Sequence, residues 1–226
     1  MIYFTNEDCM NGMGRYPDKY FDLSIVDPPY FSGPERRKYY GRSKSATGVK
    51  RTYNPSTNLW CVPGREYFDE LMRVSKYYIV WGCNYFDYNF HPGRIVWDKV
   101  NGKSTFSDAE IAATNLFTSV RLIAYMWNGM FQGKSIAEGR IQQGNKRLNE
   151  KRIHPTQKPV VLYEHILQKY AQPGWKILDT HVGSGSSLIA CDKIGLDCVG
   201  FEIDPAYFES ASERLRKNIE VLSDGK

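Results

Sequence analysis

Residues 175–202 read WKILDTHVGSGSSLIACDKIGLDCVGFE. The stretch begins with a short apolar strand that ends before Asp179, continues into a glycine-containing loop, and then has a predicted helix over Ser186–Lys193. A second predicted strand, Cys198–Phe201, leads directly to an acid, Glu202. Strand, glycine loop, helix and strand follow one another in the order of a βαβ unit of a parallel sheet. The stretch therefore predicts an α/β fold.

The loop GSG at residues 183–185 indicates a nucleoside ligand. Glycines let backbone amides approach a ligand at a helix N-terminus, and an acid at the end of the next strand, here Glu202, can hold a ribose diol. The dinucleotide pattern Gly-x-Gly-x-x-Gly is incomplete because Leu188 takes the third position, and Asp179 would repel a pyrophosphate. S-adenosylmethionine, with its cationic and zwitterionic tail, fits better. The alternative is a structural turn with a capping serine.

A second informative stretch is Asp27-Pro28-Pro29-Tyr30, which follows a predicted strand over Phe21–Val26. Open α/β sheets bind ligands at the carboxyl ends of their strands. The Asp27 carboxylate and the Pro28 carbonyl can accept hydrogen bonds from an amino group, and Tyr30 can stack on a ring. Prolines fix φ and lack an N–H, so the carbonyls here stay free of helix or sheet bonds. The stretch predicts a site for a planar, amino-bearing ring, and a plain strand-ending turn is the alternative.

The rest of the chain supplies further elements of one domain. A length of 226 residues with 42% hydrophobic and 14% aromatic content favours a single domain with a buried core. The predicted helices are residues 65–76, Val160–Tyr170 and Pro205–Lys217, and the predicted strands are Ile2–Thr5, Tyr77–Trp81, Arg94–Trp97 and a strand pair of Glu110–Thr114 with Arg121–Met126.

Positive charge is concentrated in two irregular segments. The net charge is +5, but residues 31–60 hold seven basic residues against one acid, and residues 121–153 hold seven against two. This segregation favours a polyanionic partner over two solvated loops. The five cysteines are scattered without metal-clip or redox spacing, and no secretory signal or membrane-spanning stretch is evident. We therefore expect a cytoplasmic protein with free thiols and without a metal.

Together these stretches resemble the amino-group DNA methyltransferases, which modify N6 of adenine or N4 of cytosine with S-adenosylmethionine. The resemblance rests on DPPY at 27–30, HPTQKP at 154–159, DTHVGSGSS at 179–187 and GFE at 200–202. Because the catalytic motif precedes the cofactor motif, the order looks like the permuted subgroup called beta. The resemblance implies one Rossmann-like methyltransferase domain over residues 1–226. It further implies a seven-stranded, mostly parallel sheet with one antiparallel strand near its edge and with the amino-terminal strand beside the strand that ends at Glu202.

The resemblance also implies roles by position. The catalytic group would be Asp27, Pro28, Pro29 and Tyr30, and the cofactor site Asp8, Lys158, Asp179, Thr180, Gly183, Ser184, Gly185 and Glu202. Residues 31–60 would form a basic DNA-facing loop and residues 118–153 a target-recognition insertion. The expected DNA-contacting residues are Arg36, Arg37, Lys38, Lys50, Arg51, Arg140, Lys146 and Arg147. Double-stranded DNA is the expected partner, and a homodimer is one way for so small a chain to span its target.

Two stretches depart from the family's usual pattern. Members usually read Asp-Pro-Phe where this chain has Asp-Thr-His at 179–181, and Gly-Ser-Gly-Thr-Thr where it has Gly-Ser-Gly-Ser-Ser at 183–187. The serines keep the hydroxyl groups. We expect His181 to replace a packing residue and not to act as a catalytic base, because the sequence offers it no proton-transfer partner. His154 is expected to be structural.

The implied reaction is a direct in-line methyl transfer to an amino group of a base that has been flipped out of the duplex. Asp27 favours adenine, since a serine often opens the corresponding tetrad of the cytosine-N4 enzymes. Three alternatives remain open at this point: transfer to cytosine N4, transfer to RNA or to a protein amide, and a DNA-binding protein that has lost catalysis.

Overall fold

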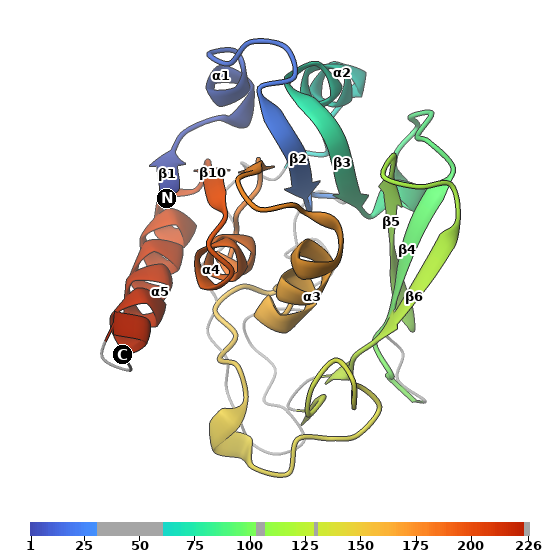
Figure 1. Cartoon of the computed structure of the whole chain (residues 1–226), viewed down its shortest axis with the longest axis vertical. Helices are drawn as coiled ribbons and strands as arrows, with labels where there is room; N and C mark the ends of the chain where they lie inside the picture. Colours follow the sequence, from blue (N-terminus) through green and yellow to red (C-terminus); the bar gives the residue numbers. More distant parts are fainter. Residues whose placement is uncertain (31–60, 103–106, 129–130, 224–226) are drawn as a thin grey trace.

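The computed structural model describes residues 1–30, 61–102, 107–128 and 131–223. The predicted basic loop at residues 31–60, with Arg36, Arg37, Lys38, Lys50 and Arg51, lies outside the described residues. Two layers of helices enclose a central sheet, as Figure 1 shows. The predicted α/β class is therefore confirmed.

The central sheet has eight strands within the described residues, in the order β1-β10-β9-β2-β3-β5-β4-β6. β5 runs antiparallel to both of its neighbours, and every other pairing is parallel. The prediction of one antiparallel strand in a mostly parallel sheet is confirmed, and the predicted strand count is one too low. The strands are β1 Ile2–Asn6, β2 Phe21–Val26, β3 Ser75–Trp81, β4 Gly93–Asp98, β5 Ala109–Thr114, β6 Val120–Ala124, β9 Lys176–Asp179 and β10 Asp197–Glu202. A separate small sheet pairs β7 Trp127–Asn128 with β8 Phe131–Gln132.

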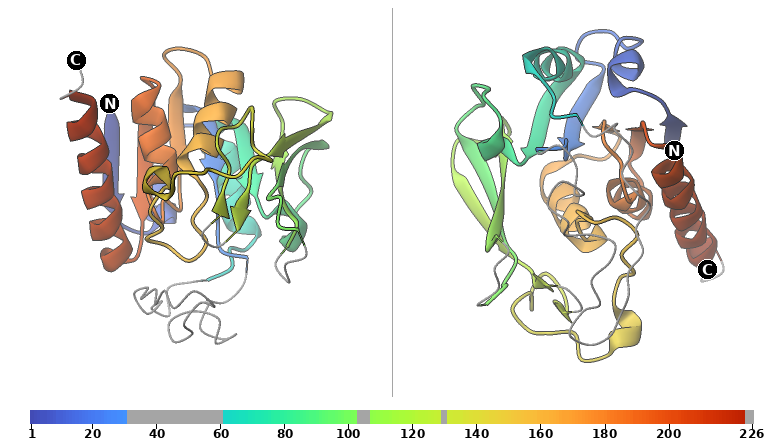
Figure 2. Two further views of the ribbon diagram at one scale, coloured as in Figure 1. Left: turned by 90° about the horizontal axis from the view of Figure 1, so that it is seen from below. Right: turned by 180° about the vertical axis from the view of Figure 1, so that it is seen from behind.

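Helices cover both faces of the sheet, as the views of Figure 2 show. On one face, α1 packs on α2, and on the other face α3 packs on α4. The helices are α1 Cys9–Met13, α2 Arg65–Val74, α3 Val160–Tyr170, α4 Ser186–Lys193 and α5 Pro205–Ser223, with short 3-10 turns η2 Cys83–Tyr85 and η3 Lys146–Leu148.

Alternating side chains of β3 explain why both faces need a cover. Ile79 and Trp81 belong to the core that α3 and α4 complete. Tyr78 and Val80 belong to a second core, with α2. All four are at most 6% exposed. Strands of a parallel sheet that are buried on both faces are apolar throughout and not alternately polar.

The register of the outer strands tests two predictions. β1 lies beside β10, with Asn6 opposite Glu202, so the predicted place of the amino-terminal strand is confirmed. The predicted strand pair of Glu110–Thr114 with Arg121–Met126 is wrong, because β4 lies between β5 and β6 and pairs with both. Sequence proximity favours a hairpin between β5 and β6, but β6 instead runs parallel to β4 at the edge of the sheet.

The predicted recognition insertion, residues 118–153, begins inside the sheet. β6 is its first element, and the chain leaves the sheet only after that strand (Figure 1). Its far end is anchored by Glu150, whose side chain accepts a hydrogen bond from the Val160 amide at the start of α3 and pairs with Arg214 of α5. The structure therefore holds this segment at both ends.

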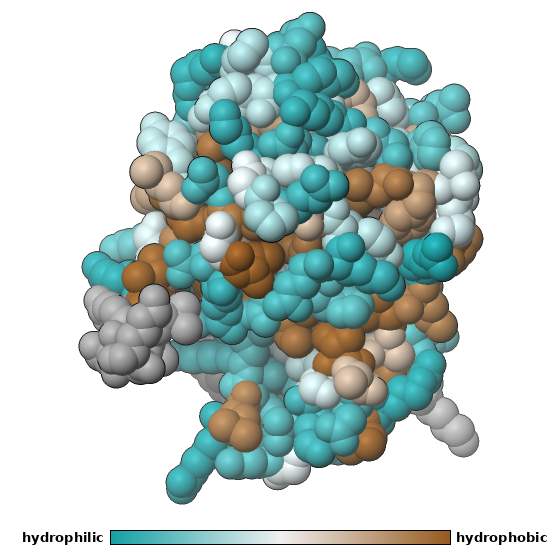
Figure 3. Space-filling view, viewed as in Figure 1, coloured by the Kyte–Doolittle hydropathy of each residue, from teal (hydrophilic) through white to brown (hydrophobic). Residues whose placement is uncertain are grey.

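The surface of the molecule is largely hydrophilic at the end that carries α1 and α2, and hydrophobic residues gather elsewhere on the same face (Figure 3). Val120 and Leu122 of the edge strand β6 are each 65% exposed. No helix within the described residues is long and apolar enough to span a membrane.

Candidate active site

Four neighbouring parallel strands each lead to an acidic side chain at the same edge of the sheet. β10 and β9 end at Glu202 and Asp179, β2 is followed directly by Asp27, and β1 is followed closely by Asp8. The order β1-β10-β9-β2 makes these strands consecutive neighbours, and neighbouring strands lie about 4.8 Å apart. The topology thus gathers four carboxyl groups at the edge where open α/β sheets bind ligands.

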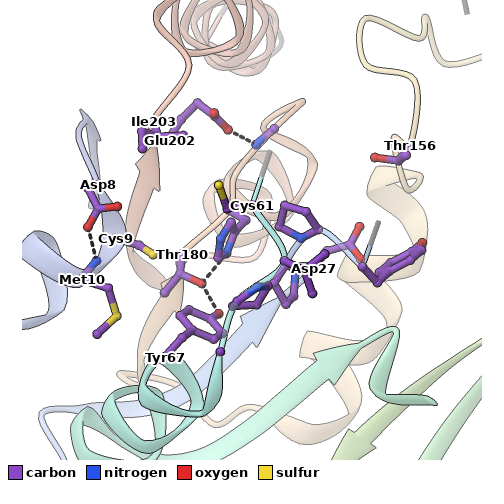
Figure 4. Close-up of a pocket in the computed structure, with 18 of the residues that line it drawn as sticks. Asp8, Cys9, Met10, Asp27, Cys61, Tyr67, Thr156, Thr180, Glu202 and Ile203 are labelled. Atoms are coloured by element: carbon purple, nitrogen blue, oxygen red, sulfur yellow. Dashed lines mark hydrogen bonds between the residues drawn. The ribbon is translucent and has the colours of Figure 1, made fainter. Parts of the chain in front are cut away.

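A cavity of about 370 Å³ opens at this edge. Figure 4 shows Asp8 and Glu202 on one side of it and Asp27 on the other, with Thr180 between them. Of the predicted site residues, the cavity is lined by Asp8, Asp27, Pro28, Pro29, Tyr30, Thr180, Gly183 and Glu202. A smaller adjoining cavity of about 40 Å³ is lined by Lys158 and Ser184. Asp179 and Gly185 line neither of the two cavities.

Lys158 contacts the carboxylates of two acids, a pairing that the sequence did not predict. Its ammonium pairs with Asp27 and lies 2.9 Å from Glu110 Oε2, and Lys99 Nζ lies 2.9 Å from the other oxygen of Glu110. The Lys158 side chain is only 1% exposed. The second oxygen of Asp27, Oδ1, is buried and has no hydrogen-bond partner among the described residues. Asp27 is therefore held by one oxygen and leaves the other available as an acceptor.

The pKa values of the two acids in this cluster shift in opposite directions. Burial raises the pKa of Asp27, and the ammonium of Lys158 offsets the rise only in part. Burial opposes the ionisation of Glu110 too, but Lys158 and Lys99 together lower its pKa to about 2. Burial lowers the pKa of Lys158, and the two carboxylates outweigh burial, so its pKa lies above the usual value. Of the two acids, Asp27 is the one that can take up a proton.

Tyr30 stacks on Tyr85, which lies in η2 just after β3. Its ring lies on Tyr85 with centroids 4.7 Å apart and planes inclined by 7°. Gly82, which joins β3 to η2, has φ +68°, and a Cβ at this position would lie 2.5 Å from Tyr30 Cδ1. A glycine is needed here both for the left-handed backbone and for the room that the tyrosine ring takes.

The glycine loop is organised by the two acids at the ends of β9 and β10. Asp179 accepts hydrogen bonds from the Ser187 hydroxyl and from the His181 amide at 3.0 Å, so its carboxylate faces the loop. Glu202 accepts from the Gly183 amide at 2.8 Å and from the Asp204 amide at 2.9 Å. Burial raises the pKa of Asp179 to about 6 and that of Glu202 to about 7. Both acids shape the loop, and of the two Glu202 also lines the cavity.

Asp8 has a local structural role as well as a place in the cavity. It is the N-cap of α1, where its Oδ1 accepts from the Met10 and Asn11 amides at 2.9 and 3.2 Å. Cys9, the next residue, also lines the cavity, and burial raises the pKa of its thiol to about 12. The thiol is therefore protonated near neutrality and is a poor nucleophile.

Several residues of the site carried no sequence signal. Glu110 is a lone acid within a strand, and Tyr67 and Tyr85 look like ordinary core aromatics. Such residues reach the site through pairings between distant segments, which local patterns do not reveal. The cavity also receives His154 and Thr156 of the HPTQKP stretch and His181 of the loop.

The described residues of the predicted DNA-contacting set lie outside this cavity. Arg140 pairs with Asp98 at 2.7 Å and its side chain is 62% exposed. Lys146 and Arg147 lie on η3 with exposed side chains. Among the described residues, no group of three or more His, Cys, Asp or Glu side chains is placed to hold a metal ion.

Known proteins resemble this chain in sequence and in fold. The model of the family described as DNA methylase, the N6/N4 amino-group methyltransferases, matches residues 90–213. YubD of Escherichia coli (strain K12) is 25% identical over 233 residues, covering 100% of this chain and 95% of YubD. The Type II methyltransferase M.HinfI of Haemophilus influenzae is 23% identical over 261 residues, covering 96% of this chain and 70% of M.HinfI.

Two solved structures share the fold. The M1.HpyAVI–SAM complex has a TM-score of 0.54 at 18% identity, with 95% of this chain and 100% of that chain covered. The PvuII DNA methyltransferase, which is cytosine-N4-specific, has a TM-score of 0.55 at 12% identity, with 100% of this chain and 93% of that chain covered. The family model covers more than half of the chain, and the motif order is the permuted one. The chain belongs to the DNA methylase family of N6/N4 amino-group methyltransferases, which are S-adenosylmethionine-dependent.

Proposed function

We propose that this protein transfers a methyl group from S-adenosylmethionine to the N6 amino group of adenine in double-stranded DNA. The observation that carries the proposal is the unpartnered Asp27 Oδ1, buried at the rim of a cavity whose far side is formed by Asp8 and Glu202. An amino group is a hydrogen-bond donor, and a buried acceptor without a partner is costly unless a ligand supplies the donor.

The residues of the cavity fit the cofactor by their chemistry. Gly183 and Gly185 have φ of +54° and +78°, so the loop keeps a left-handed backbone without side chains at these positions. Glu202 retains lone pairs beyond those that it shares with two backbone amides, and these can accept from the ribose hydroxyls. When bound, S-adenosylmethionine supplies the electrophilic methyl group.

The chain's own groups would position and activate the amine. Asp27 Oδ1 accepts one N–H of the amino group, and the Pro28 carbonyl, which accepts no hydrogen bond from the described residues, takes the other. These two bonds favour a pyramidal nitrogen whose lone pair faces away from both acceptors. Asp27, whose pKa is raised by burial, can then take up the proton that the methylated nitrogen loses. Alignment of two bound reactants is worth roughly 7–11 kcal/mol at best.

Cytosine N4 is the second candidate, because the PvuII enzyme with a similar fold has that specificity. An acid rather than a serine at position 27 supports adenine. The basic segments support DNA over a protein amide, and the intact Asp27, Gly183 and Glu202 support an enzyme over a catalytically silent relative.

The proposal is tested by nucleoside mass spectrometry of duplex DNA after incubation with the protein and S-adenosylmethionine. We expect N6-methyladenine from the wild type, and none from Asp27→Ala, which should keep its affinity for the cofactor. Asp22→Ala is a matched control on the same strand, since Asp22 pairs with Lys76 away from the cavity. N4-methylcytosine as the sole product would refute the adenine assignment, and normal transfer by Asp27→Ala would refute the mechanism.

A further inference from the structure

His181 and Asp27 line the same cavity. β2 and β9 are parallel neighbours, with Leu23 opposite Ile177 and Ser24 opposite Leu178. Asp27 directly follows β2, and His181 follows the end of β9 after Thr180. An acceptor and an imidazole ring thus follow two neighbouring strands at one cavity, where the family usually has an acceptor and a phenyl ring.

A chain of hydrogen bonds determines which ring nitrogen of His181 carries the proton. The Tyr67 hydroxyl lies 2.6 Å from Thr180 Oγ1, which lies 2.9 Å from His181 Nδ1 (Figure 4). Tyr67 is 3% exposed, and Thr180 is its only hydrogen-bond partner among the described residues. A buried hydroxyl hydrogen without an acceptor is costly, so Tyr67 donates to Thr180. Thr180 has one hydroxyl hydrogen, and it is donated to His181 Nδ1.

If Nδ1 is an acceptor, the proton of the neutral ring is on Nε2. Burial lowers the pKa of His181 to about 4, so the ring is neutral at pH 7. Nε2 has no partner among the described residues and is not fully enclosed. The wall of the cavity therefore presents an N–H donor from His181 as well as the Asp27 acceptor.

We propose that His181 Nε2–H and the Asp27 carboxylate together read an amino group and the ring nitrogen beside it, which are N6 and N1 in adenine. The inference rests on the proposed function and adds a selectivity to it. Cytosine offers the same donor and acceptor at N4 and N3, whereas thymine and guanine offer a carbonyl beside an N–H, the reverse order. A reversed base would set two donors and two acceptors against each other, so the pair rejects thymine, and it rejects guanine presented through O6 and N1.

The contact is tested with duplexes in which the target adenine, located by sequencing methylated DNA, is replaced by 1-deazaadenine, and by 7-deazaadenine as the matched control. For the wild type we expect 1-deazaadenine to lower kcat/KM about tenfold, the loss of one buried hydrogen bond, and 7-deazaadenine to have little effect. His181→Phe should show a similar loss on adenine and no further loss on 1-deazaadenine. His181→Gln, which keeps a donor, should recover part of the loss, and His165→Phe on α3 should change nothing.

The outcomes distinguish failure of the proposed His181 contact from failure of the proposed methyl transfer. If the losses from His181→Phe and from 1-deazaadenine multiply when the two are combined, His181 Nε2 does not contact N1 of the target adenine. The inference then fails, while the methyl-transfer activity stands. If no DNA is methylated, the proposed function fails and the inference with it. Nitrogen-15 NMR adds a readout that packing alone would not move. We expect an unprotonated Nδ1 for His181, identified by the signal that His181→Phe removes, and a protonated Nδ1 would overturn the assignment.

Discussion

Lys158 connects two buried acids, Asp27 and Glu110, and Glu110 has a second counter-ion in Lys99. The sequence placed Lys158 in the cofactor site, because the HPTQKP stretch resembles a family motif. The structure pairs its ammonium with Asp27 and Glu110. The Asp27 tetrad could be predicted because prolines give a local signal, whereas the partner of Lys158 on β5 could not, because a single glutamate in a strand has none.

We expect Lys158→Met to destabilise the fold by about 3–5 kcal/mol, the usual cost of leaving buried charges without their partner. Without the ammonium, the folded-state pKa of Asp27 rises further above its unfolded value, so the destabilisation should shrink as the pH falls from 8 to 5. Urea unfolding at both pH values measures this. Lys193→Met, which removes a more exposed pair with Glu164, should cost at most about 1 kcal/mol. A pH-independent cost for Lys158→Met would contradict the ion-pair network.

Glu202 should release a proton when the cofactor binds. Its pKa of about 7 lies above the ordinary 4.5, so ionising it lowers the free energy of unfolding as the pH rises between these values. Ribose hydroxyls that donate to the carboxylate favour its ionised form and lower that pKa. We expect the calorimetric binding enthalpy of S-adenosylmethionine at pH 7 to depend on the ionisation enthalpy of the buffer.

The buffer dependence should be absent at pH 9, and Glu202→Gln should reduce it strongly and weaken binding. Buffer-independent enthalpy in the wild type at pH 7 would show that Glu202 does not meet the cofactor.

At the level of elements, the turn from β3 into η2 sets the position of Tyr30. We expect Gly82→Ala to cost about 1–2 kcal/mol in backbone strain and to push the Tyr30 ring off Tyr85, because the new Cβ would lie 2.5 Å from that ring. The methyl-transfer rate should fall at least tenfold while cofactor affinity is unchanged, as measured by single-turnover kinetics and calorimetry.

Gly195→Ala provides the matched control. Gly195 has φ +73° with nothing within 4 Å of a built Cβ, so it carries the same strain without the collision. Equal loss of transfer in both variants would mean that strain, and not the position of Tyr30, is responsible.

Local sequence patterns predict the helices and strands better than they predict the order of the strands in the sheet. The βαβ unit at residues 175–202 could be predicted because its strands, loop and helix are consecutive and each has a local pattern. The order β3-β5-β4-β6 could not, since β5 enters between strands that precede it in the chain. The choice among pairings depends on contacts between distant residues, and a short apolar run is compatible with several of them.

At the scale of the whole molecule, the basic segments are the surfaces that we expect to contact DNA. Lys146 and Arg147 form no ion pairs among the described residues, whereas Arg140 is engaged by Asp98. We expect Lys146→Ala/Arg147→Ala to weaken duplex binding and to reduce the slope of log K against log salt by about 2, one for each lost phosphate contact. Fluorescence anisotropy between low and high salt measures this.

Lys193→Ala/Lys217→Ala is the control, because both lysines already pair with acids on their surface. An unchanged slope in the Lys146 and Arg147 variant would remove η3 from the DNA interface. The predicted homodimer can be checked by light scattering in the same samples, with the exposed Val120 and Leu122 of β6 as the first positions to substitute.

The most direct test of the whole account is a crystal structure of the protein with S-adenosylmethionine. We expect the ribose at Glu202 and the methyl carbon directed toward Asp27 Oδ1, about 6 Å from it, which leaves room for one amino nitrogen between them. A cofactor bound with its methyl group turned away from Asp27, or too distant for a single nitrogen to contact both, would contradict the shared site at the carboxyl edge of the sheet.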